Sequence, residues 1–324
     1  MTQTLSPGRW RGLQTTSTAR HIFNILAFDQ RGSYTDMLPP DTDYATAAAI
    51  KAEVVQALSY HVSAVLLDPD FGPTASAYMS PACGLLLSIE KSGYSGDSTY
   101  RKTEFDPSWT VTKVKQVGAQ AAKLMIYYHP HSGALAEELE MIAAQVAQAC
   151  RQHDLPLYLE PMSYSLDRAV KKESAEFAAA RPQVLVDTAR RLSALSPDVL
   201  KLEFPVDVAF DQDRERWRAA CAAVSEAASV PWVLLSAGVD FETFAEQTQI
   251  ACQEGASGYL AGRAIWKEAV TMTPEARAIF LREVAIPRAE QLNAIADQYA
   301  RPWTDFYQPQ ALGKGWYQQS SFLA

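Results

Sequence analysis

The stretch HIFNILAFDQRG (residues 21–32) decides the fold of this 324-residue chain. Its apolar run His21–Phe28 predicts a buried strand, a helical pattern follows at Tyr44–Tyr60, and a second apolar run spans Val62–Leu67. An open nucleotide-binding sheet would favour a GxGxxG turn directly after its first strand, whereas Asp29-Gln30-Arg31-Gly32 stands there. The stretch therefore favours a closed barrel of parallel strands over an open sheet.

The same alternation of strand and helix continues along the chain. The predicted strands are His21–Phe28, Val62–Leu67, Gly84–Ile89, Lys123–Tyr128, Pro156–Glu160, Val199–Phe204, Trp232–Ser236 and Gly258–Ala261. Helical patterns between them include Tyr44–Tyr60, Trp109–Val117, Gly133–Gln152, Arg181–Leu195, Arg214–Ala228 and Phe241–Glu254. Consecutive runs start far enough apart for a helical crossover. We predict an α/β protein with a single (β/α)8 TIM barrel over residues 21–300, an N-terminal extension over 1–20 and an aromatic C-terminal tail over 301–324.

The composition is that of a globular protein, with 48% hydrophobic and 20% charged residues. A formal net charge of -8 argues against nucleic acid or an anionic membrane surface as partner. The four cysteines form no CxxC pair, which is typical of a reducing compartment. The first 20 residues hold no apolar signal segment. We expect a cytoplasmic protein that does not span a membrane.

Four of the predicted strands contain or end in a charged residue. Asp29 follows Ala27-Phe28, Lys123 opens its run, Glu160 ends Leu157-Tyr158-Leu159, and Lys201 stands inside Val199–Phe204. Strands of a parallel barrel are buried on both faces, so each charge there needs a partner or a chemical task. We therefore expect two lysines and two carboxylates to converge in the barrel.

Lys201 is the strongest catalytic candidate, because strand alternation places Lys201 and Glu203 on one face and Leu200 and Leu202 on the other. Burial and a neighbouring Lys123 would lower the pKa of Lys201 and leave a neutral amine able to attack a carbonyl. Such an amine forms a Schiff base, for which Glu160 would transfer protons. A purely structural ion pair of Lys201 with Glu203 or Glu160 remains the alternative. Lys123 could also lie at a solvated barrel end.

The last two strand–helix junctions suggest a phosphate site. Ser236-Ala237-Gly238 and Gly262-Arg263 offer backbone N–H groups and a guanidinium where barrels commonly bind phosphate, although each alone is more often an ordinary turn. Asp29-Gln30-Arg31 could supply a second anion contact. His129-Pro130-His131 lacks a third zinc ligand, so we expect no metal and a loop or substrate role for His129.

The chain resembles the class I aldolase family that contains tagatose-1,6-bisphosphate aldolase and sulfofructose-phosphate aldolase. The resemblance is carried, in family order, by LAFDQRGS (26–33), SAVLLDPDFG (63–72), GLLLSIEKSGY (84–94), AAKLMIYY (121–128), LYLEPMSY (157–164), DVLKLEFP (198–205), PWVLLSAGV (231–239) and GASGYLAGRAIW (255–266). It implies that Lys201 is the Schiff-base lysine and that Glu160 and Lys123 assist it. It further implies substrate contacts by Asp29, Gln30, Ser236, Gly238 and Arg263.

These observations predict a metal-independent lyase without a cofactor that cleaves a ketohexose bisphosphate, such as tagatose 1,6-bisphosphate, to dihydroxyacetone phosphate and glyceraldehyde 3-phosphate. Arg31 and Gly262 complete the predicted substrate site. One alternative is a sulfofructose 1-phosphate aldolase that releases sulfolactaldehyde, because both branches of the family share the ketone-phosphate half. Another is a non-catalytic sugar-phosphate sensor. The family and the aromatic tail favour a homo-oligomer.

Overall fold

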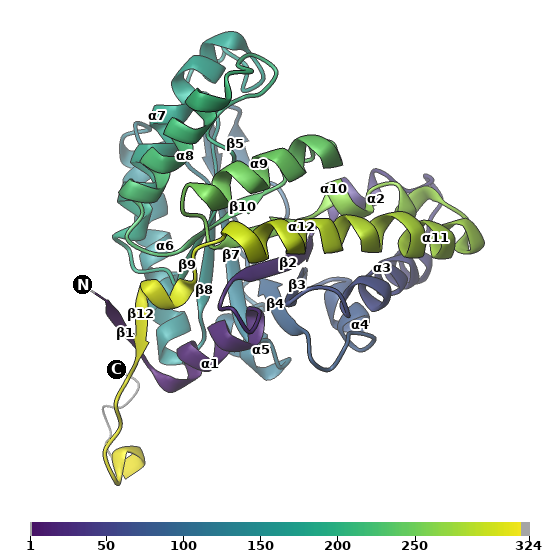
Figure 1. Ribbon diagram of the computed structural model, residues 1–324, viewed down its shortest axis with the longest axis horizontal. Helices are drawn as coiled ribbons and strands as arrows, with labels where there is room; N and C mark the ends of the chain where they lie inside the picture. The colour runs from purple at the N-terminus through teal and green to yellow at the C-terminus, as the bar shows by residue number, and fades with distance from the viewer. Residues whose placement is uncertain (1, 319–324) are drawn as a thin grey trace.

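Eight parallel strands close into a barrel in the computed structural model, which describes residues 2–318 (Figure 1). The strands follow one another around the barrel in the order β10-β11-β2-β3-β4-β7-β8-β9. Their bounds are β2 (Phe23–Phe28), β3 (Ala64–Leu67), β4 (Gly84–Ser88), β7 (Ala121–Tyr127), β8 (Leu157–Met162), β9 (Val199–Leu202), β10 (Trp232–Leu235) and β11 (Gly258–Ala261). The predicted TIM barrel is confirmed, since every predicted strand contributes to it.

Helices connect successive barrel strands. The longer ones are α3 (Tyr44–Leu58), α5 (Val111–Gln116), α6 (Ala134–Gln152), α7 (Ala175–Ser193), α8 (Arg214–Ala227), α9 (Phe241–Gln253), α11 (Pro274–Phe280) and α12 (Ile286–Tyr299). The short ones are α2 (Gly32–Thr35), α4 (Gly72–Ser76) and α10 (Arg263–Trp266), with a π-helical turn at Leu281–Ala285 and 3-10 turns at Ala269–Thr271, Trp303–Asp305 and Trp316–Gln318. Among the described residues, no helix is long and apolar enough to cross a membrane.

Several element starts differ from the prediction, most of them by one or two residues, and the starts of β7 and α7 have a clear physical reason. Strand β7 begins at Ala121 because Ala121 and Ala122 are buried and pair with β4, so Lys123 lies inside the barrel and not at a solvated end. Helix α7 begins at Ala175, six residues before the predicted Arg181, because the Ser174 side chain accepts a hydrogen bond from the Phe177 N–H and caps the helix. The helix then continues through Pro182.

The N-terminal residues close the amino end of the barrel. Helix α1 (Pro7–Thr16) packs so tightly there that a Cβ on Gly12 would lie 2.5 Å from the carbonyl oxygen of Gln120, which precedes β7. The hydroxyl groups of Thr16 and Tyr158 are hydrogen-bonded at 2.9 Å. This end of the barrel is therefore filled, and the opposite, carboxyl end is left for a ligand.

The described part of the C-terminal tail lies at the same amino end. Strand β12 (Tyr307–Pro309) pairs in parallel with β1 (Gln3–Leu5), and Figure 1 shows the two side by side. The Tyr307 hydroxyl donates to the carbonyl oxygen of Asp198, which precedes β9. The tail thus contacts the amino end through residues up to Pro309, while residues 319–324 of the predicted tail lie outside the described residues.

A small hairpin stands between β4 and α5 and was not predicted. Its strands are β5 (Ser95–Asp97) and β6 (Tyr100–Lys102). The Arg101 guanidinium lies 4.7, 5.2 and 5.4 Å from the ring centres of Tyr94, Tyr127 and Tyr164. These contacts fix the hairpin over the ends of β7 and β8.

Trp303→Ala tests the closure of the amino end. Trp303 is fully buried, its ring centre lies 4.7 Å from that of Trp10, and its indole donates to Ser17. We predict a loss of about 3–5 kcal/mol in the free energy of unfolding in urea. Tyr317→Ala, at a side chain that is 70% exposed, should change it by less than about 0.5 kcal/mol. Equal stability of the two variants would contradict this role of Trp303.

Candidate active site

A cavity of about 390 Å³ opens at the carboxyl ends of the barrel strands. All ten predicted site residues line it, namely Asp29, Gln30, Arg31, Lys123, Glu160, Lys201, Ser236, Gly238, Gly262 and Arg263. They come from strands that are distant in sequence but adjacent in the closed barrel. The predicted convergence of two lysines with Asp29 and Glu160 is what the structure shows.

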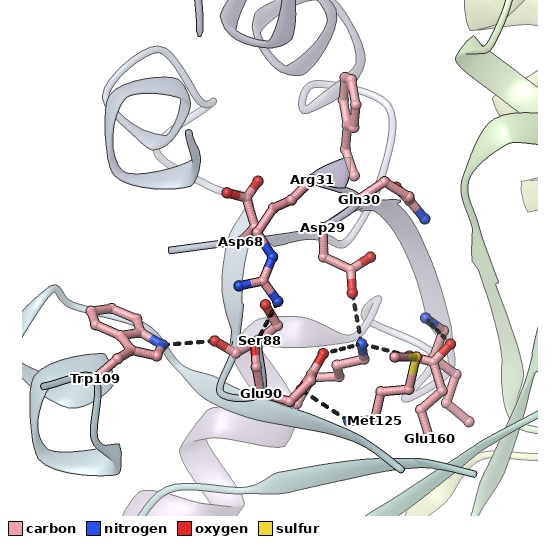
Figure 2. Close-up of polar contacts among 12 residues, drawn as sticks. Asp29, Gln30, Arg31, Asp68, Ser88, Glu90, Trp109, Met125 and Glu160 are labelled. Atoms are coloured by element: carbon pink, nitrogen blue, oxygen red, sulfur yellow. Dashed lines mark hydrogen bonds and ion pairs between the residues drawn. The ribbon is translucent and has the colours of Figure 1, made fainter. Parts of the chain in front are cut away.

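Lys123 lies at the centre of a buried ionic cluster, whose carboxylates Asp29, Glu90 and Glu160 are labelled in Figure 2. Its Nζ lies 2.7 Å from Asp29 Oδ2, 2.8 Å from Glu90 Oε1 and 2.7 Å from Glu160 Oε2. All four side chains are at least nine-tenths buried. The three carboxylates therefore surround one ammonium group that water hardly reaches.

This arrangement shifts the pKa values of Lys123 and Asp29. Burial by itself would lower the pKa of Lys123, but Asp29, Glu160 and Glu90 outweigh burial and raise that pKa well above its ordinary value. Burial likewise opposes ionisation of Asp29, yet the charges of Lys123 and Lys201 hold its pKa well below the ordinary range. Lys123 is thus a permanent cation and Asp29 a permanent anion near neutral pH.

Lys201 has a different environment from Lys123. Its Nζ lies 2.8 Å from Glu160 Oε1, and among the described residues this is its single ion pair. Glu160 therefore bridges the two lysines, one on each oxygen. The alternative partner, Glu203, is bound to other groups. Its carboxylate accepts hydrogen bonds from the Ser163 N–H and hydroxyl and forms an ion pair with Lys172. Burial opposes ionisation of Glu203, but Lys172 and Arg181 lower its pKa to about 2.

The sequence reasoning missed Glu90. Its Oε2 accepts a hydrogen bond from the Met125 N–H at 3.0 Å while its Oε1 holds Lys123, so it joins β4 to β7. Asp29 directly follows the apolar strand β2, and Glu90 follows β4 with only Ile89 between them. Glu90 also stands within the quoted segment GLLLSIEKSGY. The same signal that singled out Asp29 would have found it.

Lys51 was also missed, because it stands within the apolar helix α3. It is fully buried and its ammonium donates to the carbonyl oxygens of Phe28 and Gln30, each at 2.9 Å, and pairs with Asp68. These bonds fix the end of β2, from which Asp29 and Gln30 enter the cavity. Lys51 therefore stabilises the backbone next to Asp29 and Gln30, but its own side chain does not line the cavity.

The two junctions after β10 and β11 meet in space. Ser236 Oγ accepts a hydrogen bond from the Gly262 N–H at 3.2 Å. Ala237 and Gly238 have φ values of 47° and 83°, and a Cβ on Gly238 would lie 3.1 Å from Arg263 Nη2. Glycine therefore lets the guanidinium lie close against the turn. The result is a small concave surface of backbone amides, a hydroxyl and a guanidinium, which suits a phosphate.

The two histidines after β7 lie apart from this chemistry. His129 Nδ1 accepts from the His131 N–H at 3.2 Å, and neither ring lines the cavity. Burial, with His131, lowers the pKa of His129 to about 4, so it is neutral at pH 7. Within residues 2–318 no three His, Cys, Asp or Glu side chains lie together in a way that would hold a metal ion.

The charge of the cavity is opposite to that of the chain. Five cationic side chains line it against three carboxylates, in a protein of formal charge -8. The cations are Arg31, Lys91, Lys123, Lys201 and Arg263, and the carboxylates are Asp29, Glu90 and Glu160. A local excess of two positive charges attracts an anionic ligand of small size.

Residues 23–268 match the family described as DeoC/LacD family aldolase. The tagatose 1,6-diphosphate aldolase 2 of Streptococcus pyogenes serotype M3 is 32% identical over 94% of this chain and 99% of its own length. The tagatose 1,6-diphosphate aldolase of Lactococcus lactis subsp. lactis is 30% identical over 93% of this chain and 99% of its own length.

Two solved structures share the fold at lower identity. An archaeal fructose 1,6-bisphosphate aldolase is 17% identical with a TM-score of 0.61, covering 88% of this chain and 98% of its own. A Schiff-base-forming fructose-1,6-bisphosphate aldolase is 18% identical with a TM-score of 0.60 and the same coverage. At these identities the likeness concerns the barrel and not the substrate.

Lys123→Met tests the ionic cluster. Removing the ammonium leaves three buried carboxylates facing one another, and we predict a loss of about 3–5 kcal/mol in the free energy of unfolding at pH 8. Without the ammonium, the like charges of the three carboxylates raise one another's pKa values, so the variant takes up protons and loses repulsion as the pH falls towards 4, whereas Asp29 of the wild type stays ionised over this range. The difference between wild type and variant should therefore shrink from pH 8 to pH 4.

Lys115→Met is the matched control, because Lys115 is an exposed lysine on α5. Its effect on stability should be small at every pH. A loss in Lys123→Met that stays constant between pH 8 and pH 4 would contradict the clustered charges.

Proposed function

The chain belongs to the DeoC/LacD family of aldolases, and from that premise we propose that it cleaves tagatose 1,6-bisphosphate reversibly through a Schiff base on Lys201. The products are dihydroxyacetone phosphate and glyceraldehyde 3-phosphate. The observation that carries the proposal is the unequal pairing of the two buried lysines, three carboxylates around Lys123 and one beside Lys201. The names of the relatives and the positive cavity support the substrate.

The pairing assigns different roles to the two lysines. A nucleophilic amine must give up its proton, and Lys123 is held in the charged form by its three carboxylates. Lys201 has a single carboxylate beside it, that of Glu160, which it shares with Lys123. Its proton has a destination on Glu160 Oε1, 2.8 Å away. Lys201 is thus the nucleophile and Lys123 the fixed cation.

The reaction begins when the neutral Lys201 amine adds to the C2 carbonyl of the ketose. Glu160 passes a proton to the carbinolamine oxygen, water leaves, and an iminium forms. Glu160 then removes the proton of the C4 hydroxyl, and the C3–C4 bond breaks as C4 becomes the aldehyde. The electron pair moves into the iminium to give an enamine, and protonation at C3 followed by hydrolysis releases dihydroxyacetone phosphate.

The remaining residues bind and orient the substrate. Ser236, Gly238, Gly262 and Arg263 hold the C1 phosphate in the concave surface after β10 and β11. Asp29 Oδ1 and Gln30 Oε1 are buried and have no hydrogen-bond partner among residues 2–318, so they are acceptors for substrate hydroxyls. Arg31 adds a cation at the cavity wall. Lys123 orients Asp29 and Glu160 for these tasks.

The alternatives receive less support. The relatives named above carry the tagatose name at about 30% identity over nearly the full length, which favours the bisphosphate over sulfofructose 1-phosphate. A sensor would have no use for a buried amine beside a carboxylate.

We further propose a cytoplasmic homo-oligomer. All four cysteines are free, and burial raises the pKa of Cys83 and Cys252 to about 12, as suits inert thiols.

Substitution of the reacting groups tests the mechanism. Lys201→Ala should lower kcat for tagatose 1,6-bisphosphate cleavage by more than about 10⁴-fold, since no amine replaces it. Glu160→Gln should lower kcat by about 10²–10⁴-fold, because proton transfer is lost. A coupled assay of both triose phosphates measures the rates, and circular dichroism verifies the fold. Folded Lys201→Ala with wild-type turnover would refute the mechanism.

Chelation provides a second test. The Schiff base polarises the substrate without a metal ion, so extended dialysis against EDTA should leave kcat and KM unchanged. Loss of activity that added zinc restores would contradict the Schiff-base route and favour a metal-dependent one.

A further inference from the structure

The wall of the cavity that faces the phosphate-binding junctions carries a second pair of cations. In the order of the closed barrel, β4 and β7 lie opposite β10 and β11. The loop after β4 brings Lys91 and Ser92 into the cavity wall, and Arg31 lines the same side from the end of β2. A ligand that spans the cavity from the junctions after β10 and β11 therefore meets these cations at its other end.

The backbone at Lys91 is held in place by the segment that precedes α5. Its N–H donates to the carbonyl oxygen of Glu104 at 2.8 Å, and the preceding residue, Glu90, forms an antiparallel bridge with Phe105. The side chain itself is exposed, and it forms no direct ion pair among residues 2–318, although its charge acts at longer range on Asp106, beside which it also lines a neighbouring pocket. Lys91 thus differs from Lys123 and Lys201, whose ammonium groups are already neutralised inside the cavity.

Only some of the hydrogen-bond donors of Arg31 are bonded to other groups of the protein. Its Nη2 donates to the carbonyl oxygen of Glu90 at 2.5 Å, and Figure 2 shows the Arg31 side chain extending towards Glu90, the residue that precedes Lys91. Its Nε is buried without a hydrogen-bond partner among the described residues. A buried donor without a partner is costly, and a ligand oxygen would satisfy it.

We propose that Lys91, together with Arg31, determines specificity for a tetrahedral anion at C6 of the ketose. The inference rests on the proposed function, which places C2 at Lys201 and the C1 phosphate at Arg263. Carbons 4 to 6 then extend towards β4 and β7, where a C6 phosphate dianion meets two cations. A ketose 1-phosphate ends there in a neutral hydroxyl, which gains little from either cation.

Arg101 supports this wall without contacting the substrate. Its guanidinium is held among the rings of Tyr94, Tyr127 and Tyr164, and it does not line the cavity, whereas Tyr127 does. Lys91 is the cation of the hairpin region that faces the cavity directly.

Lys91→Met, assayed with two substrates, tests the proposal. For tagatose 1,6-bisphosphate, kcat/KM should fall about 30-fold, the order expected for one charge-assisted contact. For tagatose 1-phosphate, kcat/KM should stay within about twofold of the wild type, since no charge-assisted contact is lost. Lys91→Arg should restore most of the loss. Lys113→Met is the matched control, because Lys113 stands on α5 and lines a neighbouring pocket together with Lys91, but does not line the cavity.

A third measurement separates this proposal from the proposed function. Exchange of the C3 hydrogen of dihydroxyacetone phosphate with deuterated water requires Lys201 and the enamine but not the C6 end. Unchanged exchange with a selective loss on the bisphosphate supports the role of Lys91. Equal losses on both substrates, or no loss on either, would overturn it, while a wild-type protein without exchange would overturn the Schiff base itself.

Discussion

Everything in the site depends on the attraction between one buried ammonium group, that of Lys123, and three carboxylates. Taking these charges out of water costs several kcal/mol for each ion, and the fold tolerates this because every charge has a partner within 2.8 Å. Asp29 and Glu90 follow β2 and β4, while Glu160 stands within β8 and Lys123 within β7. Only a closed sheet brings residues of these four strands around one point.

The same cluster separates the properties of two chemically identical side chains. Lys123 is held in its charged form, and Glu160 links it to Lys201, the lysine with fewer anions around it. Environment, not residue type, thus distinguishes the amine that is held as a cation from the amine that we propose as the nucleophile. The positive excess over the whole cavity then attracts an anionic sugar, although the protein surface as a whole is acidic.

Most of the barrel could be predicted from sequence, because parallel strands that are buried on both faces leave continuous apolar runs such as Phe23–Phe28. The charged residues that interrupt these runs indicated the site, as Lys201 and Glu160 did. Glu90 carries the same signal as Asp29, a charge just beyond an apolar strand, and could have been predicted in the same way. Lys51 could not, because it stands on a helix and its contact with Phe28 arises only in the folded chain.

The division of roles between the lysines could be predicted only in part. Sequence alternation places Lys201 inside the barrel, but it does not count the carboxylates around each ammonium, since these come from distant strands. The sequence predicts Lys123 as a second positive charge near Lys201, and the structure adds that Glu160 bridges the two ammonium groups. Lys123 organises Asp29, Glu90 and Glu160, and its effect on Lys201 passes through Glu160.

The most direct measurement is borohydride reduction in the presence of dihydroxyacetone phosphate, followed by intact mass and peptide mapping. We predict one covalent adduct for each chain, located on Lys201 and not on Lys123. An adduct on Lys123, or none while the ligand still binds, would contradict the assignment of the nucleophile.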